Sequence, residues 1–158
     1  MSKVPDFNTA RLVVERFLDL VDSGAWHLLA ELYACNALVE LPFAQPTAIR
    51  LDGRDAIRAH FARVAGRVRL RVIDRHLLET TDPEVIVADY RYDGGVLPSG
   101  KRLVVSNIQI FRVRSGVIIT SRDFHDHAAL TAGLAGARRG REEPHRSVIP
   151  SLPLDRVC

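Results

Sequence analysis

The spacing of apolar residues changes part-way along the chain. Before Gly66, apolar residues recur at intervals of three and four, which is typical of helices. This spacing predicts a helix from Asn8 or Thr9 to Ser23, with Leu12, Val13, Phe17, Leu20 and Val21 on one face and Gly24 as the stop. It also predicts a short helix carrying Trp26, Leu29, Leu32 and Tyr33, and a third helix that starts near Arg54 and carries Ile57, Phe61 and Val64. Residues 37–42 are predicted as a brief strand, and residues 43–52 as a loop.

After Gly66, apolar and charged residues alternate, as in a strand with one buried face. The predicted strands cover residues 68–73, 84–93, 102–113 and 117–125. Helices followed by a meander of strands predict an α+β fold, with the helices packed on one face of a curved sheet. From Ala132 the content of Gly, Arg and Pro predicts a tail, so we expect a domain over residues 1–131 and a tail over 132–158 that is weakly structured or docks on a partner subunit.

Composition narrows the classes of partner. The chain has 158 residues, 47% hydrophobic and 26% charged, as expected of one globular domain. The N-terminus has no apolar core of a signal peptide, and no run reaches the length of a membrane span, so we expect a cytoplasmic protein without a membrane partner. The net charge of +3 comes from dispersed arginines without interleaved aromatic residues, so no nucleic-acid partner is expected.

The end of the last predicted strand concentrates titratable residues. Asp123 and His125 are two residues apart, so they project to the same side with roots about 6.5–7 Å apart. A carboxylate that near an imidazole can orient it, raise its pKa and share a proton with it, so either residue is a candidate general base. His127 would complete a metal-binding set only if the strand continued. A helix is predicted to begin there, so we expect no metal.

Several segments, in order and spacing, resemble the SnoaL-like branch of the nuclear transport factor two-like superfamily, which includes ketosteroid isomerases, polyketide cyclases and limonene epoxide hydrolases. These segments are Phe17-Leu-Asp-Leu-Val-Asp-Ser-Gly, Glu31-Leu-Tyr-Ala, Val39-Glu-Leu-Pro-Phe43, Gly53-Arg-Asp-Ala-Ile57 and Ser121-Arg-Asp-Phe-His-Asp126. The resemblance implies a cone of curved antiparallel sheet with three N-terminal helices, enclosing one apolar pocket, usually in a homodimer.

The ketosteroid isomerase residues mostly do not carry over. The general-base aspartate of those enzymes falls on Leu41, the two tyrosines on Phe17 and Phe61, and the protonated aspartic acid on Gln109. That mechanism is therefore not expected here. If Gln109 faces the pocket as its counterpart does, alternation adds Asn107 and Phe111, and the apolar face of the preceding strand adds Tyr90. We expect these seven residues to bind substrate.

Asp123 also matches an aspartate of the limonene epoxide hydrolases, whose Asp-Arg-Asp set activates water and protonates the epoxide. Arg91 and Asp93 could supply the other half, but alternation places them on the face opposite Tyr90 and Tyr92.

Two functions follow as hypotheses. The first is an enzyme without cofactor, an isomerase, cyclase or epoxide-hydrolase type, in which Asp123 and His125 act on a hydrophobic, polycyclic or terpenoid-like molecule. The second is a non-catalytic ligand-binding or dimerisation module of the same fold. No nucleotide-binding or metal motif indicates a cofactor.

Overall fold

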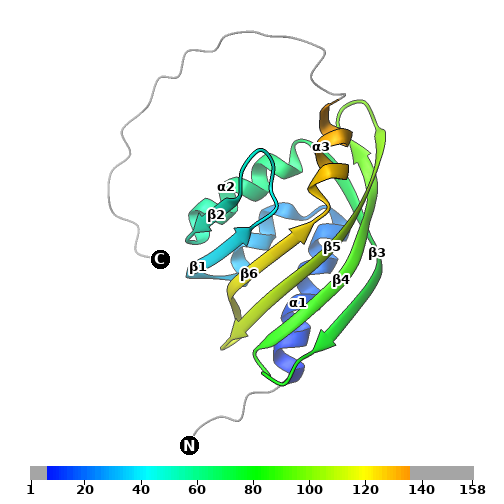
Figure 1. Ribbon diagram of the computed structural model, residues 1–158. Helices are drawn as coiled ribbons and strands as arrows, with labels where there is room; N and C mark the ends of the chain where they lie inside the picture. The colour runs from blue at the N-terminus through cyan, green and yellow to red at the C-terminus, as the bar shows by residue number, and fades with distance from the viewer. Residues whose placement is uncertain (1–6, 136–158) are drawn as a thin grey trace, which may run out of the picture.

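The computed structural model describes residues 7–135, which form a curved six-stranded sheet with helices packed along it (Figure 1). The strands are β1 (Tyr33–Leu41), β2 (Ile49–Asp52), β3 (Val68–Glu79), β4 (Val85–Val96), β5 (Lys101–Arg114) and β6 (Val117–His125). The helices are α1 (Phe7–Ser23), the 3-10 helix η1 (Trp26–Leu32), α2 (Arg54–Ala65) and α3 (His127–Ala135). The predicted α+β fold is confirmed. Helix α3 runs across the predicted start of the tail at residue 132, and the rest of that tail, 136–158, lies outside the described residues.

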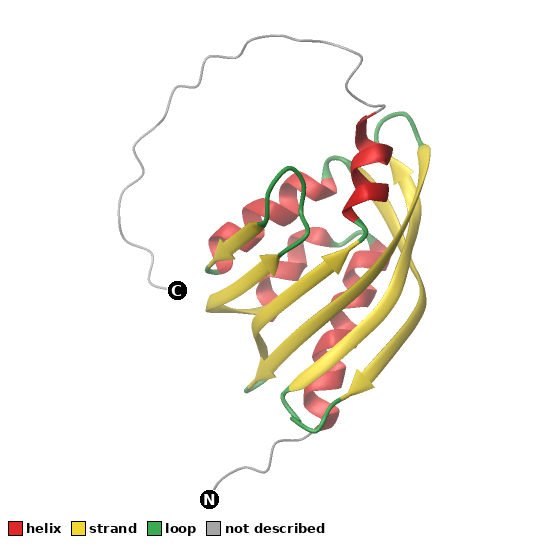
Figure 2. Ribbon diagram, in the orientation of Figure 1, coloured by secondary structure: helices red, strands yellow, loops and turns green. Residues whose placement is uncertain are grey.

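The strands follow the order β2-β1-β6-β5-β4-β3 (Figure 2). Strands β3 to β6 form the predicted antiparallel meander. One pair of strands departs from the antiparallel pattern, because β1 pairs with β6 in parallel, with Val39 opposite Ser121. These two strands come from distant parts of the sequence, so no tight turn forces them to run in opposite directions.

The first helix covers the inner face of the sheet, where it packs against β3, β4 and β5. Its buried stripe includes Val14, Phe17, Leu18 and Val21. Leu12 was predicted on this stripe, but it is 55% exposed and lies outside it. The helix ends at Ser23, and the next residue, Gly24, adopts a φ of +75° that suits glycine. None of the helices within residues 7–135 has the length and apolarity to cross a membrane.

Two boundaries near the first strand differ from the prediction. β1 begins at Tyr33, four residues before the predicted start, so Tyr33 belongs to a strand rather than to the second helix. The predicted loop 43–52 contains β2, which pairs with β1. The β2 strand has only four residues and follows Pro46, so its sequence carries little strand signal.

A bulge in β3 helps the sheet to curve. The pairing with β4 shifts between Ile73 and His76, and Asp74 within the shift has a φ of +49°. The Asp74 carboxylate forms an ion pair with Arg91 on β4. The sheet therefore bends around the helices and leaves space between the two layers.

Candidate functional site

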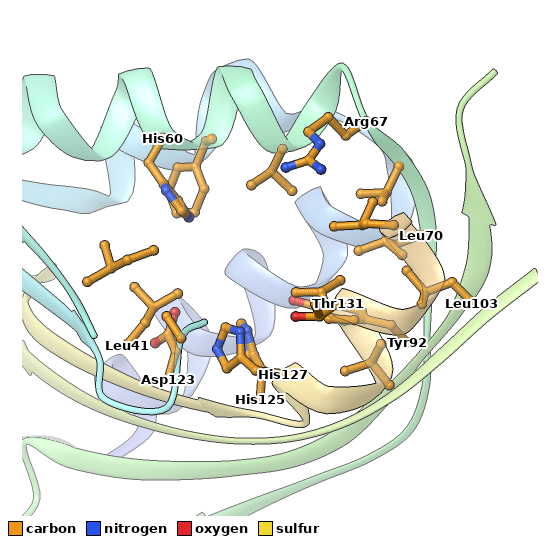
Figure 3. A pocket seen from close by; sticks show the side chains of 18 of the residues that line it. Leu41, His60, Arg67, Leu70, Tyr92, Leu103, Asp123, His125, His127 and Thr131 are labelled. Atoms are coloured by element: carbon orange, nitrogen blue, oxygen red, sulfur yellow. The ribbon is translucent and has the colours of Figure 1, made fainter. Parts of the chain in front are cut away.

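A cavity of about 220 Å³ lies between the sheet and the helices (Figure 3). Its aromatic wall consists of Phe17 from α1, Trp26 from η1 and Phe61 from α2. The Phe61 ring centroid lies 6.2 Å from those of both Phe17 and Trp26. Aliphatic side chains from the sheet and from α3 complete a mainly apolar lining, among them Leu41, Leu70, Val105 and Leu130.

Six of the nine predicted site residues line this cavity. They are Phe17, Leu41, Phe61, Gln109, Asp123 and His125. The other three, Tyr90, Asn107 and Phe111, are buried but do not line it. Phe111 packs against Phe17 with 5.1 Å between the ring centroids. Alternation along a strand identifies the inward face, but it does not indicate which part of that face the helices cover.

Asp123 brings a carboxyl group into this apolar space. It lies on β6 directly opposite Gln109 on β5, and it is 7% exposed. Ser121 Oγ donates a hydrogen bond to Asp123 Oδ1 at 3.2 Å. Burial raises the pKa of the Asp123 carboxyl from 3.8 to about 7, and the Ser121 hydroxyl and the nearby Gln109 amide oppose this rise only in part. Near pH 7 the protonated and ionised forms therefore coexist.

A chain of hydrogen bonds in the wall of the cavity orients Gln109. The Tyr90 hydroxyl donates to Gln109 Oε1 at 2.8 Å. That bond uses the single hydrogen of the Tyr90 hydroxyl, so Tyr92, whose hydroxyl oxygen lies 3.2 Å away, donates to Tyr90. Gln109 Nε2 is close enough to influence Asp123 but is not in hydrogen-bond geometry with it, and it has no partner among the described residues. The amide of Gln109 thus presents a donor beside the carboxyl of Asp123.

His125 is placed as predicted but titrates in the opposite direction. Burial lowers the pKa of its imidazole to about 3, and the neighbouring His127 and His60 add to the effect. No hydrogen bond joins His125 to Asp123 in the described structure, so the expectation that the carboxylate raises the pKa of His125 is wrong. The imidazole is neutral at pH 7, and its buried Nε2 has no partner within residues 7–135. Its ring centroid lies 6.0 Å from that of Tyr92.

Among the lining residues that were not predicted as site residues, three have basic side chains: His60, His127 and Arg67. His60 lies on α2 at helical spacing from the buried Ile57, a signal that could have placed it inward. His127 is the first residue of α3, as predicted, yet it is buried and its ring centroid lies 5.6 Å from that of His125. Burial lowers the pKa of both new histidines, so they are neutral at pH 7. Arg67 follows α2, and no pattern in the sequence marks it.

The other half of the epoxide-hydrolase set faces away from the cavity. Arg91 pairs with Asp74, and Asp93 accepts hydrogen bonds from Arg102 on the outer side of the sheet. Tyr92 lines the cavity in their place, as alternation predicts. In the described part of the chain, no group of three or more His, Cys, Asp or Glu side chains is arranged to hold a metal ion.

The family is identified by a match over most of the sequence. Residues 14–121 match the SnoaL-like domain family. This chain belongs to that family. The matched residues end two positions before Asp123, so the family match does not include Asp123 or His125.

Known relatives agree with this assignment. An uncharacterised PhzA/B-like protein of Pseudomonas aeruginosa is 29% identical over 116 residues, which cover 73% of this chain and 82% of that protein. A Bacillus subtilis protein provisionally described as an isomerase has a TM-score of 0.76 at 22% identity, covering 82% of this chain and 95% of its own. SalBIII, an epoxide hydrolase/cyclase-like enzyme of pyran ring formation in salinomycin, has a TM-score of 0.68 at 18% identity, covering 80% and 97%. The two structures share the fold of this SnoaL-like protein.

Proposed function

We propose that this SnoaL-like protein binds a small hydrophobic molecule in the cavity and that Asp123 exchanges a proton with the polar group of that molecule. The observation that carries the proposal is the Asp123 carboxyl, which is buried in a mainly apolar cavity and has a pKa of about 7. Burying an ionisable group costs free energy, and functional sites are where proteins commonly accept that cost. A group with a pKa near the working pH is suited to accept and return a proton.

Isomerisation, cyclisation and epoxide opening all require a group that accepts a proton at one step and donates it at another. Ionised Asp123 would accept a proton from a C–H or O–H group of the ligand and, once protonated, return it to another atom. The free Nε2 donor of Gln109 would stabilise an oxygen on which negative charge develops. His125 would contribute a hydrogen bond as a neutral imidazole. The sharing of a fold with SalBIII supports this class of chemistry.

The cavity limits the size of the ligand. A cavity of about 150 Å³ in another protein accommodates benzene, and this one measures about 220 Å³. One ring or two fused rings with a polar substituent fit this volume, and we propose a ligand of this size rather than the polycyclic molecule that the sequence favoured.

The second candidate is a non-catalytic ligand-binding module. The buried nitrogens of Gln109, His125 and His127 lack partners among residues 7–135, and they would bind a polar ligand group whether or not a proton is transferred. The two functions differ only in what happens to a bound compound.

One experiment separates them. A library of one-ring and two-ring ketones, enones and epoxides is screened for binding by native mass spectrometry. Each bound compound is then incubated with the protein in D₂O and followed by NMR. The enzyme hypothesis predicts deuterium incorporation or conversion that Asp123→Asn abolishes, while binding persists.

The control variant is Asp52→Asn, because the Asp52 side chain is 71% exposed and pairs with Arg50 at the surface. Activity in this variant should equal that of the parent protein. Binding without exchange or conversion in the parent would support the ligand-binding module, and turnover that survives in Asp123→Asn would refute the role of Asp123.

We also propose that two copies of the chain pair through the outer face of the sheet. Ile108 on β5 lies opposite Phe124 on β6, and the Phe124 ring packs on Phe43, with 5.5 Å between the centroids. Phe43 is 61% exposed and Ile108 is 47% exposed, and Val104 further along β5 is also exposed. Exposed apolar side chains gathered on one face are costly in water, which supports an interface there.

A further inference from the structure

Arg67 gives the rim of the cavity a positive charge. It occupies the turn between α2 and β3, and its side chain lines the cavity although the residue is exposed. Figure 3 shows its guanidinium directed over the cavity, on the side away from Asp123. The cavity therefore has a carboxyl group and a guanidinium at separate ends.

The backbone of Arg67 is held at both of its polar groups. Its N–H donates to the Val64 carbonyl at 3.0 Å, and its carbonyl accepts from the Leu97 N–H at 2.8 Å. The next residue, Val68, is buried and lines the cavity. The position from which the side chain extends is thus fixed by the fold.

The guanidinium of Arg67 has no partner in residues 7–135, where it forms neither an ion pair nor a side-chain hydrogen bond. Most arginines in that range, such as Arg58 and Arg114, form ion pairs with surface carboxylates. Arg16, Arg63 and Arg69 also lack an ion pair there, but they do not line the cavity. Arg67 is therefore distinguished by being both unpaired and directed at the site.

Among residues 7–135, no other lining group neutralises this charge. Asp123 is the only carboxyl among the lining residues that the structure describes, and it is partly protonated at pH 7. His60, His125 and His127 have lowered pKa values and are neutral. An anionic group of a ligand at the rim would supply the missing negative charge.

We infer that the ligand of this cavity carries a carboxylate at the end opposite its reacting group, and that Arg67 binds this carboxylate. A guanidinium donates two parallel hydrogen bonds that match the geometry of a carboxylate. The apolar ring of the ligand then occupies the aromatic wall, and its neutral polar group reaches Gln109 and Asp123. The inference rests on the proposed ligand-binding function and specifies the chemical class of the ligand.

Matched pairs of ligands test this inference. One-ring and two-ring aromatic and cyclohexenyl carboxylic acids are compared with their primary amides, which have nearly the same shape without the charge. Dissociation constants are measured by calorimetry for the parent protein, Arg67→Gln and Arg63→Gln. Arg63 is exposed on α2 and does not line the cavity, so its substitution removes the same charge nearby without removing a rim group.

The parent protein should bind the carboxylates about tenfold more tightly than the amides. Arg67→Gln should abolish this preference, because the acids lose more affinity than the amides do, and Arg63→Gln should retain it. Amides that bind the parent as tightly as the acids, or a preference that survives in Arg67→Gln, would overturn the role of Arg67 and leave the proposed function standing. If neither series binds the parent protein while ketones or epoxides of the same size do, the carboxylate is refuted. If no compound binds at all, the proposed function fails as well.

Discussion

Replacing Asp123 by asparagine should change how the stability of the protein depends on pH. The carboxyl has an ordinary pKa of 3.8 in the unfolded chain and a pKa of about 7 in the folded one, mainly because it is buried. At about 1.4 kcal/mol for each pKa unit, ionised Asp123 destabilises the folded state by about 4 kcal/mol. Asparagine has nearly the same shape and cannot ionise.

The sign of the effect follows from proton binding. Below about pH 4 both states hold the proton, and the carboxyl exerts no penalty. Between about pH 4 and pH 7 the unfolded chain releases the proton while the folded protein retains it, so unfolding becomes more favourable as the pH rises. Above about pH 7 the full penalty applies. The difference in free energy of unfolding between Asp123→Asn and the parent should therefore grow in favour of the variant across this range, by about 4 kcal/mol in total.

Urea unfolding at several pH values measures this difference. The chain has a single tryptophan, Trp26, which is buried and reports unfolding by its fluorescence. All other titrating groups are the same in the two proteins, so their contributions cancel in the difference. The exposed substitution Asp52→Asn is the control, because it removes a surface carboxyl without altering the cavity. A difference between Asp123→Asn and the parent that does not change with pH would show that the carboxyl is not buried as described.

Three further predictions concern other parts of the molecule. The pKa of His125 is lowered to about 3, so this neutral imidazole destabilises the folded state as the pH falls from about 6.5 towards 3. His125→Gln should therefore reduce the loss of stability in acid, measured by urea unfolding. An acid sensitivity equal to that of the parent would contradict the burial of His125. Phe17→Ala should lower the free energy of unfolding by about 3–5 kcal/mol, whereas Leu12→Ala, at a 55% exposed position, should change it by less than about 0.5 kcal/mol. Similar losses of unfolding free energy in the two variants would refute the described packing of α1. Ile108→Glu should convert a dimer into a monomer in light scattering coupled to gel filtration, and a parent protein that is already monomeric would refute the proposed pairing.

The sequence predicted well what depends on local periodicity. Alternation placed Asp123 and His125 on one face of β6, and the resemblance to the SnoaL-like branch made that face the inner one. Alternation also placed Arg91 on the face of β4 opposite Tyr90 and Tyr92. The alternation itself requires only that successive side chains of a strand point to opposite sides. The strand boundaries near Tyr33 were less predictable, because a short helix and a strand can bury the same apolar residues.

Features that depend on distant parts of the chain could not be predicted in this way. The parallel pairing of β1 with β6 joins segments about eighty residues apart, as the pair Val39 and Ser121 shows. Arg67 lines the cavity only because the turn after α2 lies at its rim, and this follows from the packing of α2 over the sheet. The pKa of His125 likewise depends on how much of the strand the other elements cover, so spacing from Asp123 gave the wrong direction.

The hydrogen bonds from Tyr92 through Tyr90 to Gln109 make the hydrogen-bonding property of the site depend on Tyr90, which does not line the cavity. With its oxygen engaged by Tyr90, the Gln109 amide is held in one of its two orientations, and the cavity receives a nitrogen rather than an oxygen. Tyr90→Phe would release that amide to rotate, and a donor site would become one that also accepts hydrogen bonds. Homologues with identical cavity linings can therefore differ in the ligands they select, and a comparison of SnoaL-like proteins for specificity should include the tyrosine behind the wall.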